Sequence, residues 1–383
     1  MPFQLRRQPN GSYAVYHARL RETMHPHLGP WEEATRLYAG GSGLERALTG
    51  RKQPGDRAEI VVFDVGLGGA ANALAAIACR EGLVRSGRQV RPLAIVSFEQ
   101  DLEALAFVVD HADELGYPRG YLDALRAILA RGEWDAPGIR WELRLGDFAR
   151  LIQSEPRRAD IVFFDPFSHR TNPVMWSVPV LEGVYRCRRP GSGQRLVTYS
   201  SAFSVRAALL LAGYYVGDGV RLDGRPTTIA VTSSADLEEP LDLGWLARWR
   251  RDREPWPPET PQERHKAVRE ALLAHPQWSR FELEAEAAQR GMSAHRETAG
   301  RPGAAANRGA DTHRGAGTNR EADSQREAPA HRTSPPGRHP GGPRPASTAT
   351  PGKAPARPQA PRPPQAIRRP RKERAKHRER GRD

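Results

Sequence analysis

The segment Ile60–Asn72 reads IVVFDVGLGGAAN, an apolar run that ends in a glycine-rich turn and continues with helical spacing. Ile60–Val65 is rich in β-branched residues and has the length of a strand buried on both faces. Gly66 and Gly68 have no side chains, so the backbone of the turn can approach a ligand closely. The segment therefore predicts a strand, a tight turn and a helix, with a purely structural turn as the alternative.

Four more apolar runs of strand length follow, and most are separated by segments of helical spacing. The expected strands are Leu93–Phe98, Ile139–Leu145, Ile161–Phe164 and Arg195–Tyr199, and the expected helices are Ala70–Glu81, Leu102–Leu115 and Ser204–Leu211. Two strand-like runs on either side of Asp223-Gly224 predict a hairpin that closes the sheet. Strands that alternate with helices indicate an α/β fold with a mostly parallel sheet.

We divide the chain into four parts by composition and pattern. Residues 1–58 are a lead-in with small strands around Tyr13–Tyr16, residues 59–235 hold the sheet, and residues 236–295 form a helical extension. In the extension, Thr260-Pro261-Gln262-Glu263 resembles a capping box that starts a helix over 261–274, and a further helix is expected over Ser279–Gln289.

The fourth part, residues 296–383, is rich in proline and arginine. From 301 to the end it has 20 Lys+Arg against 7 Asp+Glu, and Ile367 is its one large aliphatic residue. Such a segment cannot bury enough apolar surface to offset the entropy of ordering, so we expect a disordered basic tail. Basic residues attract nucleic-acid phosphates, although a solubilising extension is the alternative.

Several classes of protein are excluded by the rest of the composition. Cys79 and Cys187 are too few for a disulfide framework or a four-cysteine zinc site, and no metal is expected. The chain has no apolar run of 18 residues and no apolar stretch after its first basic residues. We therefore expect a soluble, cytoplasmic protein without a membrane segment.

Acidic residues stand at or beyond the ends of two expected strands. A glycine turn of this kind suits S-adenosylmethionine as well as a dinucleotide. Glu99 ends the second strand, where one carboxylate can accept both ribose hydroxyls, although a solvated carboxylate is the alternative. Asp147, after Gly146, either accepts from an adenine amino group or caps a turn.

The most informative segment is the fourth strand, which runs directly into Asp165-Pro166-Phe167-Ser168-His169. The ligand crevice of an open parallel sheet lies at the carboxyl ends of its strands. There Asp165 can hold an amine and accept its proton, while the carbonyl of Pro166 orients the lone pair toward a methyl donor. His169 is a base, a phosphate contact or a surface residue. A plain turn would leave the following Asn172-Pro173-Val174-Met175-Trp176 without a role.

Together these motifs resemble the methyltransferase domain of the bacterial tRNA wobble-uridine modification enzymes. That family methylates the 5-aminomethyl group of 2-thiouridine to 5-methylaminomethyl. The resemblance covers residues 11–233 and includes the lead-in segment Glu22–His25 with Trp31–Ala34, the Asn-Pro-x-Met-Trp run and the later Tyr199–Arg206. It implies a class I, Rossmann-like methyltransferase with seven strands, the last of them antiparallel, and S-adenosyl-L-methionine as the cofactor.

The resemblance also implies the roles of individual residues. The catalytic residues would be Asp165 and Pro166. The cofactor would contact Asp64, Gly66, Gly68, Asn72, Glu99 and Asp147, and the substrate would contact Phe167, His169, Asn172, Met175 and Trp176.

This chain departs from the family at three places: Ala70 replaces a glycine, Asp64 replaces a glutamate, and Pro166–His169 replaces Gly-Phe-x-Pro. Residues 234–383 could not form the flavin-dependent oxidase domain that many relatives carry. The function that we expect is N-methylation of tRNA by a monofunctional enzyme. The alternatives are a methyltransferase that acts on a small-molecule or protein amine, and a catalytically silent RNA-binding adaptor.

Overall fold

The computed structural model describes residues 2–25, 28–50, 59–191, 193–252, 255–279 and 281. The predictions for the basic tail and for a helix over 279–289 lie outside these residues, apart from isolated positions at 279 and 281. A small antiparallel sheet opens the chain, with strands β1 (Phe3–Arg7), β2 (Tyr13–His17) and β3 (Glu22–Thr23).

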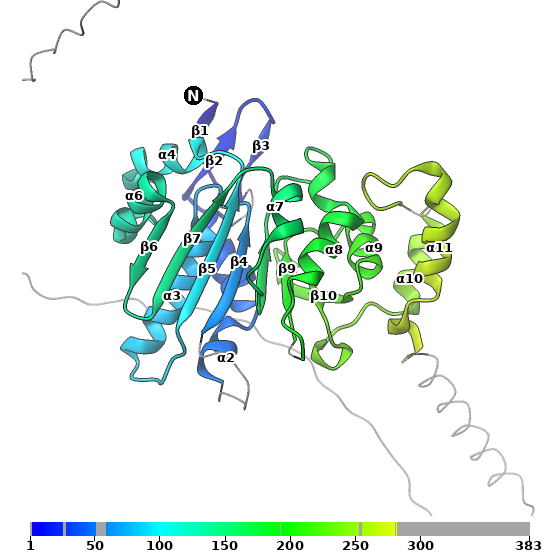
Figure 1. Ribbon diagram of the computed structural model, residues 1–383. Coiled ribbons are helices and arrows are strands. Elements are labelled where there is room, and N and C mark those ends of the chain that lie inside the picture. The colour runs from blue at the N-terminus through cyan, green and yellow to red at the C-terminus, as the bar shows by residue number, and fades with distance from the viewer. Residues whose placement is uncertain are drawn as a thin grey trace, which may run out of the picture. The chain divides into compact units, whose positions relative to one another are not determined.

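The main sheet has eight strands in the order β10-β11-β9-β8-β4-β5-β7-β6 (Figure 1). Their bounds are β4 (Ile60–Val65), β5 (Leu93–Glu99), β6 (Glu133–Ala136), β7 (Ile139–Leu145), β8 (Ile161–Phe164), β9 (Arg195–Thr198), β10 (Tyr215–Leu222) and β11 (Arg225–Val231). Strands β7, β5, β4, β8 and β9 are parallel, and β11 is antiparallel to both of its neighbours.

The fold class is as predicted, with one strand more than the seven expected. The additional strand is β6, which pairs antiparallel with β7 at the edge of the sheet. Its sequence, Glu-Trp-Asp-Ala, has only two apolar residues and places charges along an exposed edge. Charged edge strands resist pairing with other chains, and they also lack the apolar run by which a strand is recognised.

The helices and helical turns lie between the strands and after them. They are α1 (Pro30–Glu33), η1 (Ala34–Gly40), α2 (Leu44–Thr49), α3 (Ala71–Arg85), α4 (Glu103–Asp110), α5 (Ala112–Leu115), η2 (Arg119–Tyr121), α6 (Leu122–Arg131), α7 (Phe148–Ser154), η3 (Pro173–Trp176), α8 (Val178–Arg186), α9 (Phe203–Leu211), η4 (Ser234–Asp236), α10 (Leu243–Arg251), η5 (Gln262–Arg264), α11 (His265–Leu273) and η6 (Pro276–Trp278). The expected helix Leu102–Leu115 is thus two helices, divided at His111.

Both faces of the sheet are covered, which explains the continuous apolar strands. Alternate residues of β4 belong to two separate cores: Val61 and Phe63 pack with α7, α8 and α9, whereas Ile60 and Val62 pack with η1, α3 and α6. Successive side chains of a strand point to opposite faces, so a strand between two helical layers has no polar side.

The C-terminal extension packs on the core. Trp245, Trp249 and Trp278 are buried with residues of α9 and β10. The buried side chain of Gln277 accepts from the backbone N–H of Val216 at 2.7 Å and donates to its carbonyl at 2.9 Å. The N–H and the carbonyl of Val216 at the sheet edge thus both bind Gln277, which fixes the extension against β10.

The predicted capping box is wrong. Pro261 is the residue before the first helical turn, its backbone is extended, and no side chain caps that turn. The regular helix α11 begins only at His265. Among the described residues, no helix is long and apolar enough to cross a membrane.

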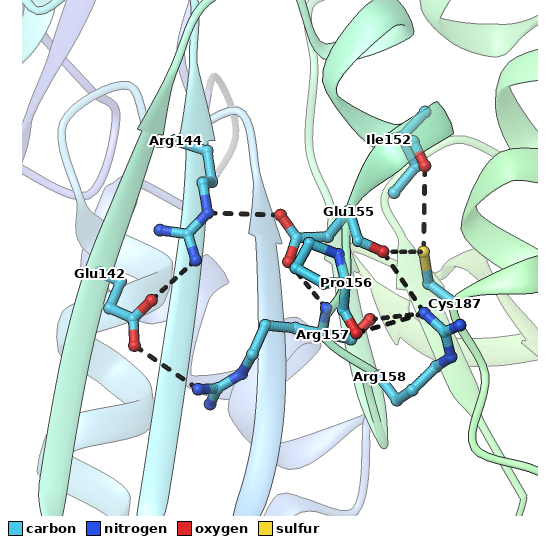
Figure 2. Close-up of polar contacts among 8 residues, drawn as sticks. All are labelled: Glu142, Arg144, Ile152, Glu155, Pro156, Arg157, Arg158 and Cys187. Atoms are coloured by element: carbon cyan, nitrogen blue, oxygen red, sulfur yellow. Dashed lines mark hydrogen bonds and ion pairs between the residues drawn. The ribbon is translucent and has the colours of Figure 1, made fainter.

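A network of charged groups fixes the connection between α7 and β8 to the sheet (Figure 2). Arg144 on β7 donates to Glu155 at 3.3 Å and to Glu142 at 2.7 Å, and Arg157 forms an ion pair with Glu142 at 3.5 Å. The Glu155 carboxylate also accepts from the backbone N–H of Arg157. This loop leads directly into β8, and Asp165 follows that strand, so the position of the loop affects the position of Asp165.

Candidate active site

A cavity of about 990 Å³ lies at the carboxyl ends of the parallel strands. Five strands each contribute the residues that follow or end them: Gly66 after β4, Glu99 at the end of β5, Asp147 after β7, Asp165 after β8 and Tyr199 after β9. The strand order reverses between β4 and β8, so the cavity lies at the switch point where such sheets bind ligands.

The glycine turn after β4 is shaped by its contact with the fourth strand. Gly66 has a φ of +87°, and a Cβ atom there would lie 2.6 Å from the carbonyl oxygen of Asp165. Gly68, with a φ of +49°, has more room, since its nearest neighbour is the sulfur of Met24. Gly66 is therefore needed for the close approach of Asp165, and both residues line the cavity.

Glu99 and Asp147 line the same part of the cavity, and both already have backbone partners. Glu99 accepts from the N–H groups of Gly68 and Gln100, each at 2.8 Å. Burial raises the pKa of its carboxyl, and these two hydrogen bonds lower it again. Asp147 caps α7 by accepting from the N–H of Ala149 at 3.0 Å. Asp147 thus caps a helix and also lines the cavity, and its contact with adenine stays a prediction.

Asp165 lies at the centre of a buried polar cluster. Asn72 donates to its carboxylate at 2.8 Å, and His25 Nε2 lies 4.0 Å from the same oxygen. Burial raises the pKa of Asp165, the charge of His25 lowers it, Glu33 raises it again, and the net value is about 6. At neutral pH the carboxylate is therefore mostly ionised and can accept a proton.

Asp64 lies beneath this cluster and is not among the residues that line the cavity. It accepts from the hydroxyl of Ser97 at 2.7 Å, and that hydroxyl accepts in turn from the indole of Trp141 at 2.9 Å. Burial raises the pKa of Asp64 to about 7, against the hydrogen bond from Ser97. Its second oxygen has no hydrogen-bond partner among the described residues.

The loop after Asp165 is held by groups from two sides. Tyr199 donates its hydroxyl to the carbonyl of Pro166 at 3.0 Å, and the indole of Trp176 donates to the carbonyl of Phe167 at 2.9 Å. Glu22 of the N-terminal sheet accepts from the hydroxyls of Ser168 and Thr171. The small sheet therefore anchors the loop that carries the expected substrate contacts.

Comparison with known proteins agrees with this geometry. Residues 117–231 match the family described as S-adenosyl-L-methionine-dependent methyltransferase. The chain contains a methyltransferase domain of this class. The cofactor of the domain is accordingly S-adenosyl-L-methionine.

Two curated relatives are bifunctional MnmC proteins of tRNA 5-methylaminomethyl-2-thiouridine biosynthesis. The chain is 30% identical to the protein of Ralstonia nicotianae over 77% of this chain and 44% of that protein. It is 29% identical to the protein of Paracidovorax citrulli over 67% of this chain and 37% of that protein. The chain thus spans less than half the length of either relative.

A solved structure confirms the fold of the methyltransferase domain. The crystal structure of MNMC2 from Aquifex aeolicus is similar with a TM-score of 0.53 and 23% identity, and the match covers 71% of this chain and 83% of that one. At this identity the similarity concerns the fold alone.

Most of the residues that the sequence suggests for the methyltransferase site lie together. The cavity wall includes Asp165, Pro166, Gly66, Gly68, Asn72, Glu99, Asp147, Phe167, Asn172 and Met175. Three others lie off the wall, namely Asp64, His169 and Trp176. Trp176 supports the wall through its bond to Phe167, and the pKa of His169 is lowered by burial and by Arg170.

Sequence reasoning assigned no role to four polar residues of the cluster: His25, Glu33, Tyr38 and Tyr199. Three of them come from the part of the lead-in after its small strands, which has no apolar strand end and no glycine motif that marks a site. The available signal was a polar, histidine-containing segment beside an acidic pair, Glu32-Glu33, before an apolar run. Such a pattern indicates an ordinary surface loop unless the fold brings it over the sheet.

Proposed function

We propose that this chain is an N-methyltransferase that transfers a methyl group to the 5-aminomethyl group of wobble 2-thiouridine in tRNA. The observation that carries the proposal is the shared cavity. One wall holds the glycine turn with Glu99, and the other holds Asp165, Pro166 and the loop to Met175. A methyl donor and an amine acceptor bound at these walls would meet at Asp165.

The residues present fit the cofactor. A carboxylate has about four acceptor positions, so each oxygen of Glu99 has one left for a ribose hydroxyl after its backbone contact. The Oδ1 atom of Asn72 is buried at the cavity wall without a hydrogen-bond partner among the described residues, which is the position of an acceptor for a ligand ammonium group. When bound, S-adenosylmethionine supplies a methyl group on a positively charged sulfur, which is a good leaving group.

The chain's own residues must then deliver a neutral amine. Asp165 draws an ammonium group into the cavity and accepts its proton, and Asn72 fixes the orientation of the carboxylate. Tyr199 holds the carbonyl of Pro166 by one lone pair, which leaves the second to orient the amine. Alignment and exclusion of water supply the remainder of the rate enhancement.

The rim of the cavity favours a polyanionic substrate. Arg21 and Arg225 line the cavity, Arg19 is exposed two positions before Arg21, and Arg170 is exposed between Ser168 and Thr171, which also line it. None of the four forms an ion pair with a carboxylate in the described part of the chain. Unpaired arginines of this kind bind nucleic-acid phosphates, with the release of counterions. Exposed apolar side chains at the rim, Leu20 and Val174, offer contacts to a base.

The names of the relatives support tRNA as the partner, because both contain tRNA 5-methylaminomethyl-2-thiouridine biosynthesis. The basic tail adds positive charge that would strengthen the same interaction. Its part in binding is a prediction that lies outside the described residues.

The test is methyl transfer by the full chain. We would first measure S-adenosylmethionine binding by calorimetry and then incubate the chain with labelled cofactor and tRNA from cells that lack their own modifying enzyme. The expected result is label in 5-methylaminomethyl-2-thiouridine. Cofactor binding without labelled tRNA would move the acceptor to another amine, and no cofactor binding would leave the silent RNA-binding adaptor.

Asp165→Asn is the matched variant, since asparagine keeps the shape of the side chain and removes the proton acceptor. General bases contribute about 10²–10⁴-fold, so we expect kcat to fall by about 10²-fold or more with little change in cofactor affinity. Asp135→Asn, on the exposed strand β6, is the control with unchanged activity. Equal activity of Asp165→Asn and the wild type would refute the role of Asp165.

A further inference from the structure

His25 is held over Asp165 in a backbone conformation that histidine seldom adopts. Its φ is +54°, in the left-handed region, where a residue with a side chain is strained by about 1–3 kcal/mol. The residue before it, Met24, is fixed by a backbone hydrogen bond to Val15 of 2.8 Å. Strain of this kind persists only where the surrounding structure imposes it, and such positions cluster at functional sites.

The two nitrogens of the imidazole ring face two different carboxylates. Nδ1 lies 3.3 Å from Glu33 Oε1, and Nε2 lies 4.0 Å from Asp165 Oδ2. The side chains of His25 and Asp165 are 12% and 13% exposed, and that of Glu33 is 6% exposed. Water therefore screens these charges weakly, and each pair interacts more strongly than it would at the surface.

Glu33 makes the imidazole a cation. A buried carboxylate without a partner is costly, so Glu33 favours the protonated ring. Burial lowers the pKa of His25, but the charges of Glu33, Asp165 and Asp64 raise the value to about 9. The ring therefore carries its proton throughout the neutral range and cannot take one from the substrate.

Several charged and titratable groups of the described residues surround Asp165. They are His25 from the lead-in, Glu33 from α1, Tyr38 from η1, Asp64 from β4 and Tyr199 after β9, with Asn72 of α3 as a neutral donor. His25 is the positive group in this set, and Glu33 and Asp64 are negative. Without His25, the acidic neighbours would favour the protonated form of Asp165.

We propose that His25, kept as an imidazolium by Glu33, is a positioning residue that holds the carboxylate of Asp165 ionised and oriented toward the cavity. Glu33 is the second member of this pair and acts only through His25. The inference rests on the proposed function, since it assigns Asp165 the task of accepting the proton of the amine. It adds residues from the lead-in, where no motif of the methyltransferase sheet lies.

The first test is the pH dependence of methyl transfer by His25→Gln in the full chain. An opposite charge within about 4–6 Å lowers the pKa of a carboxyl by about 1–3 units. Loss of the imidazolium should therefore move the acid limb of the kcat profile upward by about one pH unit or more, with cofactor affinity unchanged. A role in folding alone would lower activity at every pH without moving the limb, and that result would overturn the inference.

The second test needs no catalysis. In protein labelled with carboxyl-¹³C aspartate, the resonance of Asp165 is assigned by its loss in Asp165→Asn. It should titrate at higher pH in His25→Gln than in the wild type, and an unchanged titration would overturn the inference. If the wild type transfers no methyl group to tRNA while this shift is observed, the proposed substrate fails and the inference about His25 stands.

Glu33→Gln keeps the inference testable if His25→Gln does not fold. Loss of the Glu33 charge should lower the pH at which the His25 imidazole titrates, measured by NMR, by about one unit or more. The same titration in Glu32→Gln is the matched control, because Glu32 pairs with Arg36 at the surface and should leave His25 unchanged. An imidazole that titrates alike in Glu33→Gln and the wild type would overturn the proposal.

Discussion

Three carboxylates, those of Glu33, Asp64 and Asp165, lie around the imidazole of His25 on the floor of the cavity. Buried charges are tolerated only when they are paired or shift their pKa. Here both occur, since Glu33 is paired and the pKa values of Asp64 and Asp165 are raised to about 7 and about 6. The cluster therefore lowers the stability of the fold at neutral pH, and it leaves a site that can bind a cation and accept its proton.

This cost gives a prediction for Asp64. Its pKa is raised from 3.8 to about 7 on folding, so the stabilisation from its bound proton is present below about pH 4 and is lost as the pH rises to about 7. Asp64→Asn removes this loss. We expect the free energy of unfolding of the variant, relative to the wild type, to increase between pH 5 and pH 8 by about 1–3 kcal/mol.

Denaturant unfolding at the two pH values measures the effect. The hydrogen bond from Ser97 has an acceptor in the asparagine as well, so that contact does not dominate the comparison. A difference between variant and wild type that is the same at pH 5 and pH 8 would show that Asp64 does not titrate in this range.

At the scale of elements, the site depends on how closely the turn after β4 approaches the end of β8. Gly66→Ala places a Cβ atom 2.6 Å from the Asp165 carbonyl oxygen and also strains the backbone at a φ of +87°. Gly87→Ala is the matched control, since its φ is +76° and nothing lies within 4 Å of the added atom. Thermal unfolding should give a loss of about 1 kcal/mol for Gly87→Ala and at least about 2 kcal/mol for Gly66→Ala.

Gly66→Ala should also impair methyl transfer, because the collision displaces Asp165, whereas Gly87→Ala should leave transfer unchanged. Equal losses of stability in the two variants would mean that the turn relaxes without cost and that the close approach is not required.

The charged network of Figure 2 makes a separate prediction for the loop before β8. Glu155 is 3% exposed and binds Arg144 and the N–H of Arg157, so Glu155→Gln leaves Arg144 with a weaker partner. Arg144 is itself 30% exposed, and solvent reduces the effect. We expect a loss of about 1–2 kcal/mol in the free energy of unfolding.

The control is Asp135→Asn, which breaks the exposed pair between Asp135 and Arg140 on β6 and β7. Surface pairs contribute about 0–1 kcal/mol, so the change should be at most about 0.5 kcal/mol. If both variants lose the same amount in denaturant unfolding, the network contributes no more than a surface pair.

At the scale of the whole molecule, the distribution of charge would decide how the proposed substrate, tRNA, binds. The combined variant Arg21→Gln and Arg225→Gln should weaken tRNA binding and reduce the slope of log K against log salt by about 1 for each phosphate contact that is lost. Arg85→Gln, at the exposed end of α3, removes an arginine that does not line the cavity. The two variants are compared by measuring tRNA binding at salt concentrations from about 50 to about 200 mM.

If the slope of log K against log salt falls equally in the combined variant and in Arg85→Gln, the phosphate contacts lie elsewhere on the protein. The wild-type chain without residues 301–383 then shows how much of the remaining slope belongs to the basic tail. Since the tail holds 20 of the 59 Lys and Arg residues, this comparison separates contacts at the rim from contacts that need no fixed geometry.

The sequence by itself determined the sheet and one half of the site. Ile60–Val65, Ile139–Leu145 and Ile161–Phe164 are strands at the bounds that their apolar runs predict, because residues buried on both faces leave a continuous local signal. The residues that follow these strands, among them Gly66, Asp147 and Asp165, share one cavity, because parallel strands end at the same edge.

Only the tertiary structure decided the other half. The approach of His25, Glu33 and Tyr38 to Asp165 joins residues more than 125 positions apart, and no local pattern encodes such a contact. The same holds for Asp64: the family resemblance implied a cofactor contact, and the pairing of β4 with β5 places its carboxylate in a buried hydrogen bond with Ser97. Local periodicity specifies which elements form, whereas the burial and ionisation of a side chain depend on every element packed against it.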